Sequence, residues 1–247
     1  MTTWKQRDPN HSAYGRPAAL FLDFYGTLTA YARATVEIIC QRVIDDCRLD
    51  QDPSSLAEQW GRHFFRRIEQ ANHDRFQTLY ECERDSFIDL IADLRPRRGA
   101  EHRIDADDYV RPLREYLRRP PIYDDVFDVL GRLHVPICLV TNADRDDVMA
   151  AIRHHGLDFD EVVTSEEARC YKPARGIFEL ALKRTGWPPA QIVHVGDSRH
   201  SDVDGANRIG LTSVLIDRAG RISDVGRAEP DYTFADLRGL LTLFDAG

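Results

Sequence analysis

The sequence predicts an α/β fold in which a doubly wound, parallel sheet carries an inserted helical bundle. From residue 120 onward, apolar strand-like runs alternate with helical patterns, as in the βαβ units of a parallel sheet. Between residues 32 and 117, four helical patterns follow one another with no strand between them. Polar signatures stand at the ends of the strand-like runs, where an open parallel sheet forms its ligand-binding crevice.

The first element is a strand, the apolar run Ala18–Leu22, which ends at Asp23. Four helices are expected next, because apolar residues then recur at steps of three and four. These helices are placed at Val36–Cys47, Ser55–Ile68, Leu79–Leu94 and Asp105–Leu117. Ser55 and Glu58 have the spacing of a capping box at the start of the second helix. A loop is expected at Pro96–Gly99.

The second half of the chain reads as alternating helices and strands. Helices are expected at residues 126–133, 148–152, 177–182 and 203–209, and strands at 137–140, 162–163, 191–195 and 213–216. The predicted domains are therefore a loose tail at 1–16, an α/β core at 17–31 and 118–247, and a helical cap at 32–117. Because the insert leaves the core just after Asp23, we expect it to lie over the crevice as a lid.

Composition excludes several classes of function. Hydrophobic residues make up 43% of the chain and charged residues 30%, as in a globular protein. The net charge of −8 argues against a nucleic-acid partner, whose binding surface would be basic. No apolar run approaches the roughly 20 residues of a membrane span. Five scattered cysteines without a C-x-x-C pair are typical of reduced thiols. We expect a cytoplasmic monomer or homodimer without a membrane partner.

Four polar signatures follow strand-like runs and should converge at the crevice. They are Asp23 with Thr27, Thr141-Asn142, Lys172-Pro173, and Gly196-Asp197 reaching to Asp202. Three carboxylates in one pocket repel one another unless a cation neutralises them. Oxygen ligands without His or Cys suit Mg²⁺, which typically binds one or two carboxylates and a substrate phosphate.

The same residues suit phosphoryl transfer. Lys172 and Thr141 can donate to phosphoryl oxygens, and Asp23 can attack phosphorus to form an aspartyl-phosphate. The sequence therefore predicts a Mg²⁺-dependent phosphatase acting on a small phosphorylated metabolite. Asn142 and Thr27 are expected to contact substrate, although Asn142 could instead bond to backbone. Asp202 could be a metal ligand, could orient Lys172, or could cap the following helix.

In this order, the four signatures resemble those of the haloacid dehalogenase superfamily of hydrolases. The first motif of that family is D-x-D-x-T, in which Asp23 and Thr27 match and Tyr25 departs. The resemblance implies that Asp23 is the nucleophile and a metal ligand, that Asp197 is a second ligand, and that the backbone carbonyl of Tyr25 completes the site. It also implies a helical cap inserted after the first strand.

The departure at Tyr25 removes the aspartate that the family uses as acid and base. A tyrosine is a poor base near neutrality because its pKa is about 10. General acid–base catalysis typically contributes about 10²–10⁴-fold. Its loss predicts a slow enzyme, a substrate with a good leaving group, or a donor supplied by the cap.

Tyr25 also raises an alternative, because D-x-Y-G-T-L resembles the first motif of metal-independent 2-haloacid dehalogenases. Those enzymes have Ser and Asn where this chain has Gly196-Asp197, and a Tyr where it has Phe178. They also place an Arg directly after a cap Trp, whereas Gly61 follows Trp60 here. A second alternative is a non-catalytic binding protein on the same fold. The cap aromatics Trp60, Phe64 and Phe65 are expected in the core of the bundle.

Overall fold

The computed structural model describes residues 17–94, 104–218 and 226–244. Its core is a six-stranded sheet in the order β3-β2-β1-β4-β5-β6, and every pairing is parallel. The strands are β1 (Ala19–Leu22), β2 (Ile137–Thr141), β3 (Glu161–Thr164), β4 (Ile192–Gly196), β5 (Thr212–Ile216) and β6 (Tyr232–Phe234). The predicted α/β fold with a doubly wound parallel sheet is confirmed.

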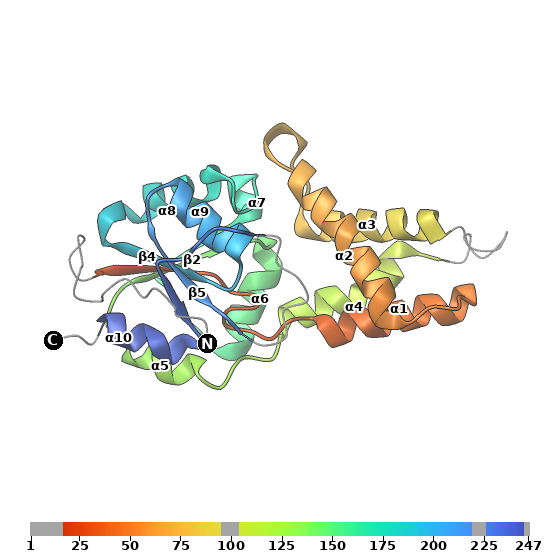
Figure 1. The fold of residues 1–247 in the computed structure, drawn as a ribbon, viewed down its shortest axis with the longest axis horizontal. Coiled ribbons are helices and arrows are strands. Elements are labelled where there is room, and N and C mark those ends of the chain that lie inside the picture. The colour runs from red at the N-terminus through yellow and green to blue at the C-terminus, as the bar shows by residue number, and fades with distance from the viewer. Residues whose placement is uncertain (1–16, 95–103, 219–225, 245–247) are drawn as a thin grey trace.

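Helices cover both faces of this sheet (Figure 1). One face packs against α5 (Val126–Arg132), α6 (Arg145–His155) and α10 (Leu241–Phe244). The other packs against α8 (Arg175–Thr185) and α9 (Gly205–Arg208), next to the short α7 (Ser165–Ala168). Successive strand residues alternate between the two hydrophobic clusters, so the strands are buried on both sides and read as continuous apolar runs.

A second group of helices stands beside the core (Figure 1). It consists of α1 (Arg33–Cys47), α2 (Pro53–Gln70), α3 (Leu79–Leu94) and α4 (Ala106–Arg118). These helices share a hydrophobic cluster that includes Ile39, Trp60 and Phe87. The helix α2 begins earlier than the predicted capping box at Ser55 implies. Its cap is Asp52, whose side chain accepts a hydrogen bond from the Ser55 N–H.

Two segments of the core differ from the prediction. The single helix expected at 203–209 is a π-helical segment, Arg199–Asp204, followed by α9. The strand β6 and the helical turns after it, Leu237–Leu240 and α10, were not predicted from sequence. The expected tail at 1–16 and the loop at Pro96–Gly99 lie outside the described residues. Throughout the described part of the chain, each helix is too short or too polar to cross a membrane.

Polar contacts join the helical group to the core. Asp144, just before α6, accepts hydrogen bonds from the backbone N–H groups of Leu79 and Tyr80 and so caps α3 from across the junction. The carboxylate of Asp147 accepts hydrogen bonds from Arg114 and Arg118 of α4. These contacts hold α3 and α4 against the loops that follow the strands.

Candidate active site

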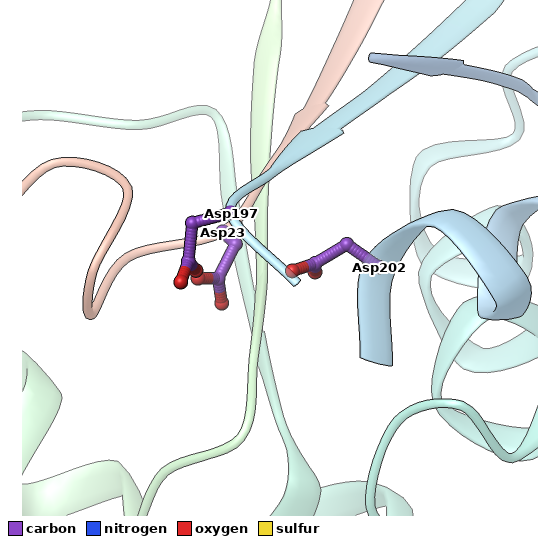
Figure 2. A group of neighbouring side chains, drawn as sticks. All are labelled: Asp23, Asp197 and Asp202. Carbon is purple, nitrogen blue, oxygen red and sulfur yellow. The ribbon is translucent and has the colours of Figure 1, made fainter. Parts of the chain in front are cut away.

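The strand order reverses between β1 and β4, and polar residues follow both strands at this point. Leu22 pairs with Val195, so Asp23 and Asp197 emerge at the same level from neighbouring strands. Figure 2 shows their carboxyl groups side by side, with Asp202 reaching toward them from the helical segment after β4. In open α/β sheets, ligands bind in the crevice at this topological switch point.

Lys172 is the cation of this cluster. Its side chain is buried, and its Nζ donates to Asp23 Oδ1 and to Asp202 Oδ1, both at 2.6 Å. Burial alone would lower the pKa of Lys172, but the carboxylates of Asp202 and Asp23 outweigh it and raise that pKa. Lys172 therefore stays protonated at neutral pH, where it can neutralise developing negative charge.

Asp202 stays ionised and forms an ion pair with Lys172. Burial works against its charge, but Lys172 and His194 hold the pKa of Asp202 well below its usual range. His194 Nε2 lies 2.9 Å from Asp202 Oδ1, and the Ser198 N–H donates to Oδ2 at 3.0 Å. A Cβ at Gly196 would lie 2.0 Å from the Asp202 carboxyl carbon, so only glycine admits this contact.

The pKa of Asp23 is shifted upward, in the opposite direction to that of Asp202. Burial raises its pKa more than the ammonium of Lys172 lowers it, and the neighbouring charge of Asp202 raises it further. The Thr27 hydroxyl lies 3.1 Å from Asp23 Oδ2 and 3.3 Å from Asp197 Oδ1, between the two carboxylates. Thr27, predicted as a substrate contact, thus contacts both acids.

Tyr31 is a site residue that sequence reasoning missed. Its hydroxyl donates to Asp197 Oδ2 at 2.7 Å. Gly26, with φ of +87°, makes room for this contact, because a Cβ there would lie 2.6 Å from the Tyr31 ring and 2.8 Å from Asp197 Oδ2. The turn after β1 therefore brings two hydroxyl donors, from Thr27 and Tyr31, onto Asp197.

The Tyr25 side chain points to the junction with the helical group. Its hydroxyl donates to the backbone carbonyl of Leu117 at 2.8 Å. Burial and then the nearby carboxylate of Asp147 raise the pKa of Tyr25 well above its usual value. Tyr25 is thus a neutral hydrogen-bond donor that links the first loop to the end of α4.

The two polar residues at the end of β2, Thr141 and Asn142, have different surroundings. The Thr141 hydroxyl is buried and has no hydrogen-bond partner among the described residues. Asn142 bonds on both sides to the backbone of Lys172, accepting from its N–H at 2.7 Å and donating to its carbonyl at 3.3 Å. Asn142 therefore fixes the Lys172 loop, and Thr141 keeps an unused donor and acceptor at the site.

The acids fit a hard divalent cation. Asp23, Asp197 and Asp202 are buried, and each offers a carboxylate oxygen within 4.8 Å of the others. The set holds three carboxylates and one ammonium, Lys172. Such an oxygen-only set suits Mg²⁺. Because Asp202 is held by Lys172 and His194, Asp23 and Asp197 are the carboxylates better placed to bind a metal.

A cavity of about 650 Å³ lies next to this cluster. Its lining includes Gly26 and Lys172 from the core and Trp60, Phe65 and Leu113 from the helical group. The expectation that Phe65 lies in the core of the bundle is wrong, because 46% of Phe65 is exposed and it faces the cavity. Trp60 is buried in the bundle, as predicted, and also borders the cavity.

Three site residues carried no readable signal in the sequence: Tyr31, His194 and Glu83. Tyr31 lies in the loop that follows the first motif, and His194 sits inside an apolar strand. Glu83 falls on the buried side of α3, where it lines the cavity. The one sequence signal for these contacts is Gly26, three residues after Asp23, because a glycine lets side chains such as Tyr31 and Asp197 come close to the backbone.

Comparison with known proteins places the chain in a family. A family model for haloacid dehalogenase-like hydrolases matches residues 17–210. The (S)-2-haloacid dehalogenase of Pseudomonas sp. (strain YL) is 28% identical over 53% of this chain and 57% of its own length. The phosphoserine phosphatase of Thermus thermophilus is 34% identical over 49% of this chain and 50% of its own length. The chain spans about half the length of these relatives.

Solved structures share the fold over nearly the whole chain. The crystal structure of the L-2-haloacid dehalogenase RSc1362 matches with a TM-score of 0.74 and 21% identity, covering 94% of this chain and 100% of that one. The matched family region contains strands β1 to β4, the carboxylate cluster and Lys172. The chain belongs to the haloacid dehalogenase-like hydrolases.

Proposed function

We propose that this hydrolase is a Mg²⁺-dependent phosphatase of a small phosphorylated metabolite, with residues 32–117 acting as its cap. The observation that carries the proposal is the buried cluster of Asp23, Asp197 and Asp202 beside one ammonium, Lys172. A divalent cation and a phosphoester together complete such a set, whereas a carboxylate substrate without metal would face it with like charge. Phosphatases among the relatives support the same choice.

The residues divide the work as follows. Asp23 attacks phosphorus as its carboxylate, the bond to the leaving oxygen breaks, and an aspartyl-phosphate forms. Lys172 and Thr141 donate to the phosphoryl oxygens, where negative charge is concentrated. Asp23, Asp197 and the Tyr25 backbone carbonyl would hold Mg²⁺, which supplies charge neutralisation at the phosphoryl group. Water then attacks the aspartyl-phosphate and regenerates Asp23.

The Tyr25 side chain supplies no base in this scheme. Its raised pKa keeps the hydroxyl protonated, and that proton is bonded to the Leu117 carbonyl. The leaving alkoxide is therefore protonated by water or by another group, which predicts slow turnover of alkyl phosphates and faster turnover of esters with better leaving groups. This matches the expected cost of losing the second aspartate of the first motif.

Tyr25 and the haloacid dehalogenase relative favour one alternative, a metal-independent 2-haloacid dehalogenase. The two reactions separate in one experiment on the purified chain. We expect release of phosphate from 4-nitrophenyl phosphate with Mg²⁺, loss of that release with EDTA, and recovery on adding Mg²⁺ back. Magnesium should also raise the melting temperature in the absence of substrate, because it binds only the folded state. Halide release from 2-chloropropionate in EDTA, without phosphate release in Mg²⁺, would refute the proposal.

Thr141→Val tests the role of the unpartnered hydroxyl. Because the Thr141 hydroxyl has no partner to lose, its isosteric replacement should leave the melting temperature unchanged or raise it. Activity should fall about 10²-fold, the typical loss for one donor to a developing oxyanion. The measurements are thermal unfolding and kcat/KM for 4-nitrophenyl phosphate. Full activity in this variant would mean that the hydroxyl does not contact the phosphoryl group.

A further inference from the structure

The positively charged side chains that line the cavity already have ion-pair partners. Among described residues, its charged side chains are Lys172, Arg208, Glu69 and Glu83. Lys172 is paired with Asp23 and Asp202, and Arg208 is paired with Asp204 at 2.6 Å. Neither cation is therefore free to meet a second anionic group of the substrate.

Glu83 is a buried acid without a partner. It lies on α3, only 6% of its surface is exposed, and its carboxyl makes no hydrogen bond or ion pair with the described residues. Burial raises the pKa of Glu83 to about 8, helped by the carboxylates of Asp144 and Asp147 and opposed by Arg114. Tyr25 and Tyr171, whose pKa values the charge of Glu83 helps to raise, stay neutral.

A carboxyl that is mostly removed from water and has no protein partner is costly to ionise unless a ligand supplies the opposite charge. Asp144 and Asp147 raise the pKa of Glu83 more than Arg114 lowers it, so the field at its carboxyl disfavours an anionic ligand group and favours a cationic one. Asp144 and Asp147 already have partners in the Leu79 and Tyr80 N–H groups and in Arg114 and Arg118. Glu83 is the buried carboxyl left for a ligand, whereas Glu69, the other acid of the lining, is exposed to solvent.

The rest of the lining suits an alkylated cation. Aromatic residues border the cavity from both the core and the helical group: Tyr31, Trp60, Phe64, Phe65, Tyr116 and Tyr171. Aromatic π faces attract ammonium ions, and clusters of such rings beside an acid recognise quaternary ammonium groups. The aliphatic residues Val36 and Leu113 would contact the methylene or methyl groups of such a ligand.

We propose that the preferred substrate is a phosphomonoester of an alcohol that carries an ammonium group, with Glu83 as the partner of that cation. The inference rests on the proposed phosphatase function and names its substrate class. The phosphoryl group lies at Lys172 and Asp23, and the cation lies deeper under α2 and α3. Sugar phosphates and substrates with a second anionic group are poor fits to this lining.

The ionisation of Glu83 gives the proposal a pH signature. In the free protein its raised pKa keeps the carboxyl protonated at neutral pH, and a cation binds only the ionised form. Relative activity on the cationic substrate should therefore rise with pH up to about 8 and then level off. Titration of Lys172 and Asp23 affects both substrates equally and cancels in the ratio, whereas the ammonium group lowers the pKa of its own phosphate, so each kcat/KM is calculated on the dianionic ester alone.

The experiment compares phosphocholine with 3,3-dimethylbutyl phosphate, its uncharged isostere, as substrates of the Mg²⁺-loaded enzyme. We expect kcat/KM to favour phosphocholine by roughly tenfold at pH 9 and by less at pH 6.5. Glu83→Gln should bring the ratio close to one at every pH while retaining turnover of the isostere. Glu58→Gln, an exposed change on α2, should leave the parent ratio unchanged.

Different results would overturn the assignment of Glu83 and the phosphatase function. A parent enzyme that hydrolyses both phosphoesters but favours the isostere, or shows the same ratio at pH 6.5 and pH 9, would overturn the assignment of Glu83. This measurement uses the parent enzyme alone, so it tests the assignment of Glu83 even if the Glu83→Gln protein does not fold. No Mg²⁺-dependent hydrolysis of either ester, or of 4-nitrophenyl phosphate, would overturn the phosphatase function and the substrate class together.

Discussion

Asp23→Asn is expected to lower phosphatase turnover by about 10⁴-fold or more while leaving the protein folded. The amide has the shape of the carboxylate but cannot attack phosphorus, so no aspartyl-phosphate forms. The residual rate then reflects only Lys172, Thr141 and the bound metal. Single-turnover phosphate release from 4-nitrophenyl phosphate is the measurement, with Asp128→Asn, an exposed acid on α5, as the matched control.

Stability should respond to this change in the opposite direction from activity. Burial raises the pKa of Asp23 in the folded protein, so the stability linked to its proton is present at low pH and is lost as the pH rises above the unfolded value of about 3.9. An asparagine is neutral at every pH and removes that loss. The melting temperature of Asp23→Asn in magnesium-free buffer at pH 7 should therefore equal or exceed that of the parent.

A different result would be informative about mechanism. If Asp23→Asn kept most of the parent rate, Asp23 would not be the nucleophile, and the carboxylate cluster would act only through the metal. If the variant melted far below the parent, the Lys172–Asp23 ion pair would matter more to the fold than burial does. The first outcome would contradict the role of Asp23 as nucleophile. The second would contradict the finding that burial raises the pKa of Asp23 more than Lys172 lowers it.

The position of the site was predictable because parallel strands carry their carboxyl ends to one edge. Asp23 and Asp197 each follow a strand and Thr141 ends one, and the structure brings Asp23 together with Asp197 and Asp202 as the alternating pattern implied. Hydrophobic periodicity also located α3 at the predicted residues, Leu79–Leu94. These features depend on local pattern and on sheet topology, both of which the sequence carries.

The partners within the site were not predictable in the same way. His194 meets Asp202 because β4 turns its side chain toward the following helical segment, and Tyr31 meets Asp197 because of the left-handed turn at Gly26. Such contacts depend on backbone turns whose geometry has no periodic signal. The residues of the helical group that line the cavity were equally hidden, because helical periodicity separates buried from exposed residues but does not separate packed residues from those that line a cavity.

Removing the ammonium of the cluster should damage both fold and catalysis. Lys172→Met keeps the length of the side chain but leaves Asp23 and Asp202 buried without their counter-ion. Loss of one partner from a buried ion pair typically costs about 3–5 kcal/mol. We expect a loss of this size in the free energy of unfolding at pH 7, measured by urea denaturation, and a fall in kcat/KM of about 10³-fold.

The pH dependence identifies the cause of that loss. In the parent, Lys172 holds the pKa of Asp202 below its unfolded value, so this contribution to stability is present above about pH 4 and is lost only as the pH falls further. Without the ammonium, burial dominates and raises the pKa of both carboxyls. The variant should then gain more stability than the parent as the pH falls from 7 to 5, because in the parent Lys172 keeps Asp202 ionised over this range.

A second substitution separates charge from shape. Adding Asp202→Asn to Lys172→Met removes one of the two uncompensated charges, so it should recover part of the lost stability at pH 7 without recovering activity. Lys183→Met, an exposed lysine of α8, should change neither property. If the single variant gained no more stability than the parent between pH 7 and pH 5, and the double variant were no more stable than the single, Lys172 would not be the counter-ion that allows these acids to be buried together.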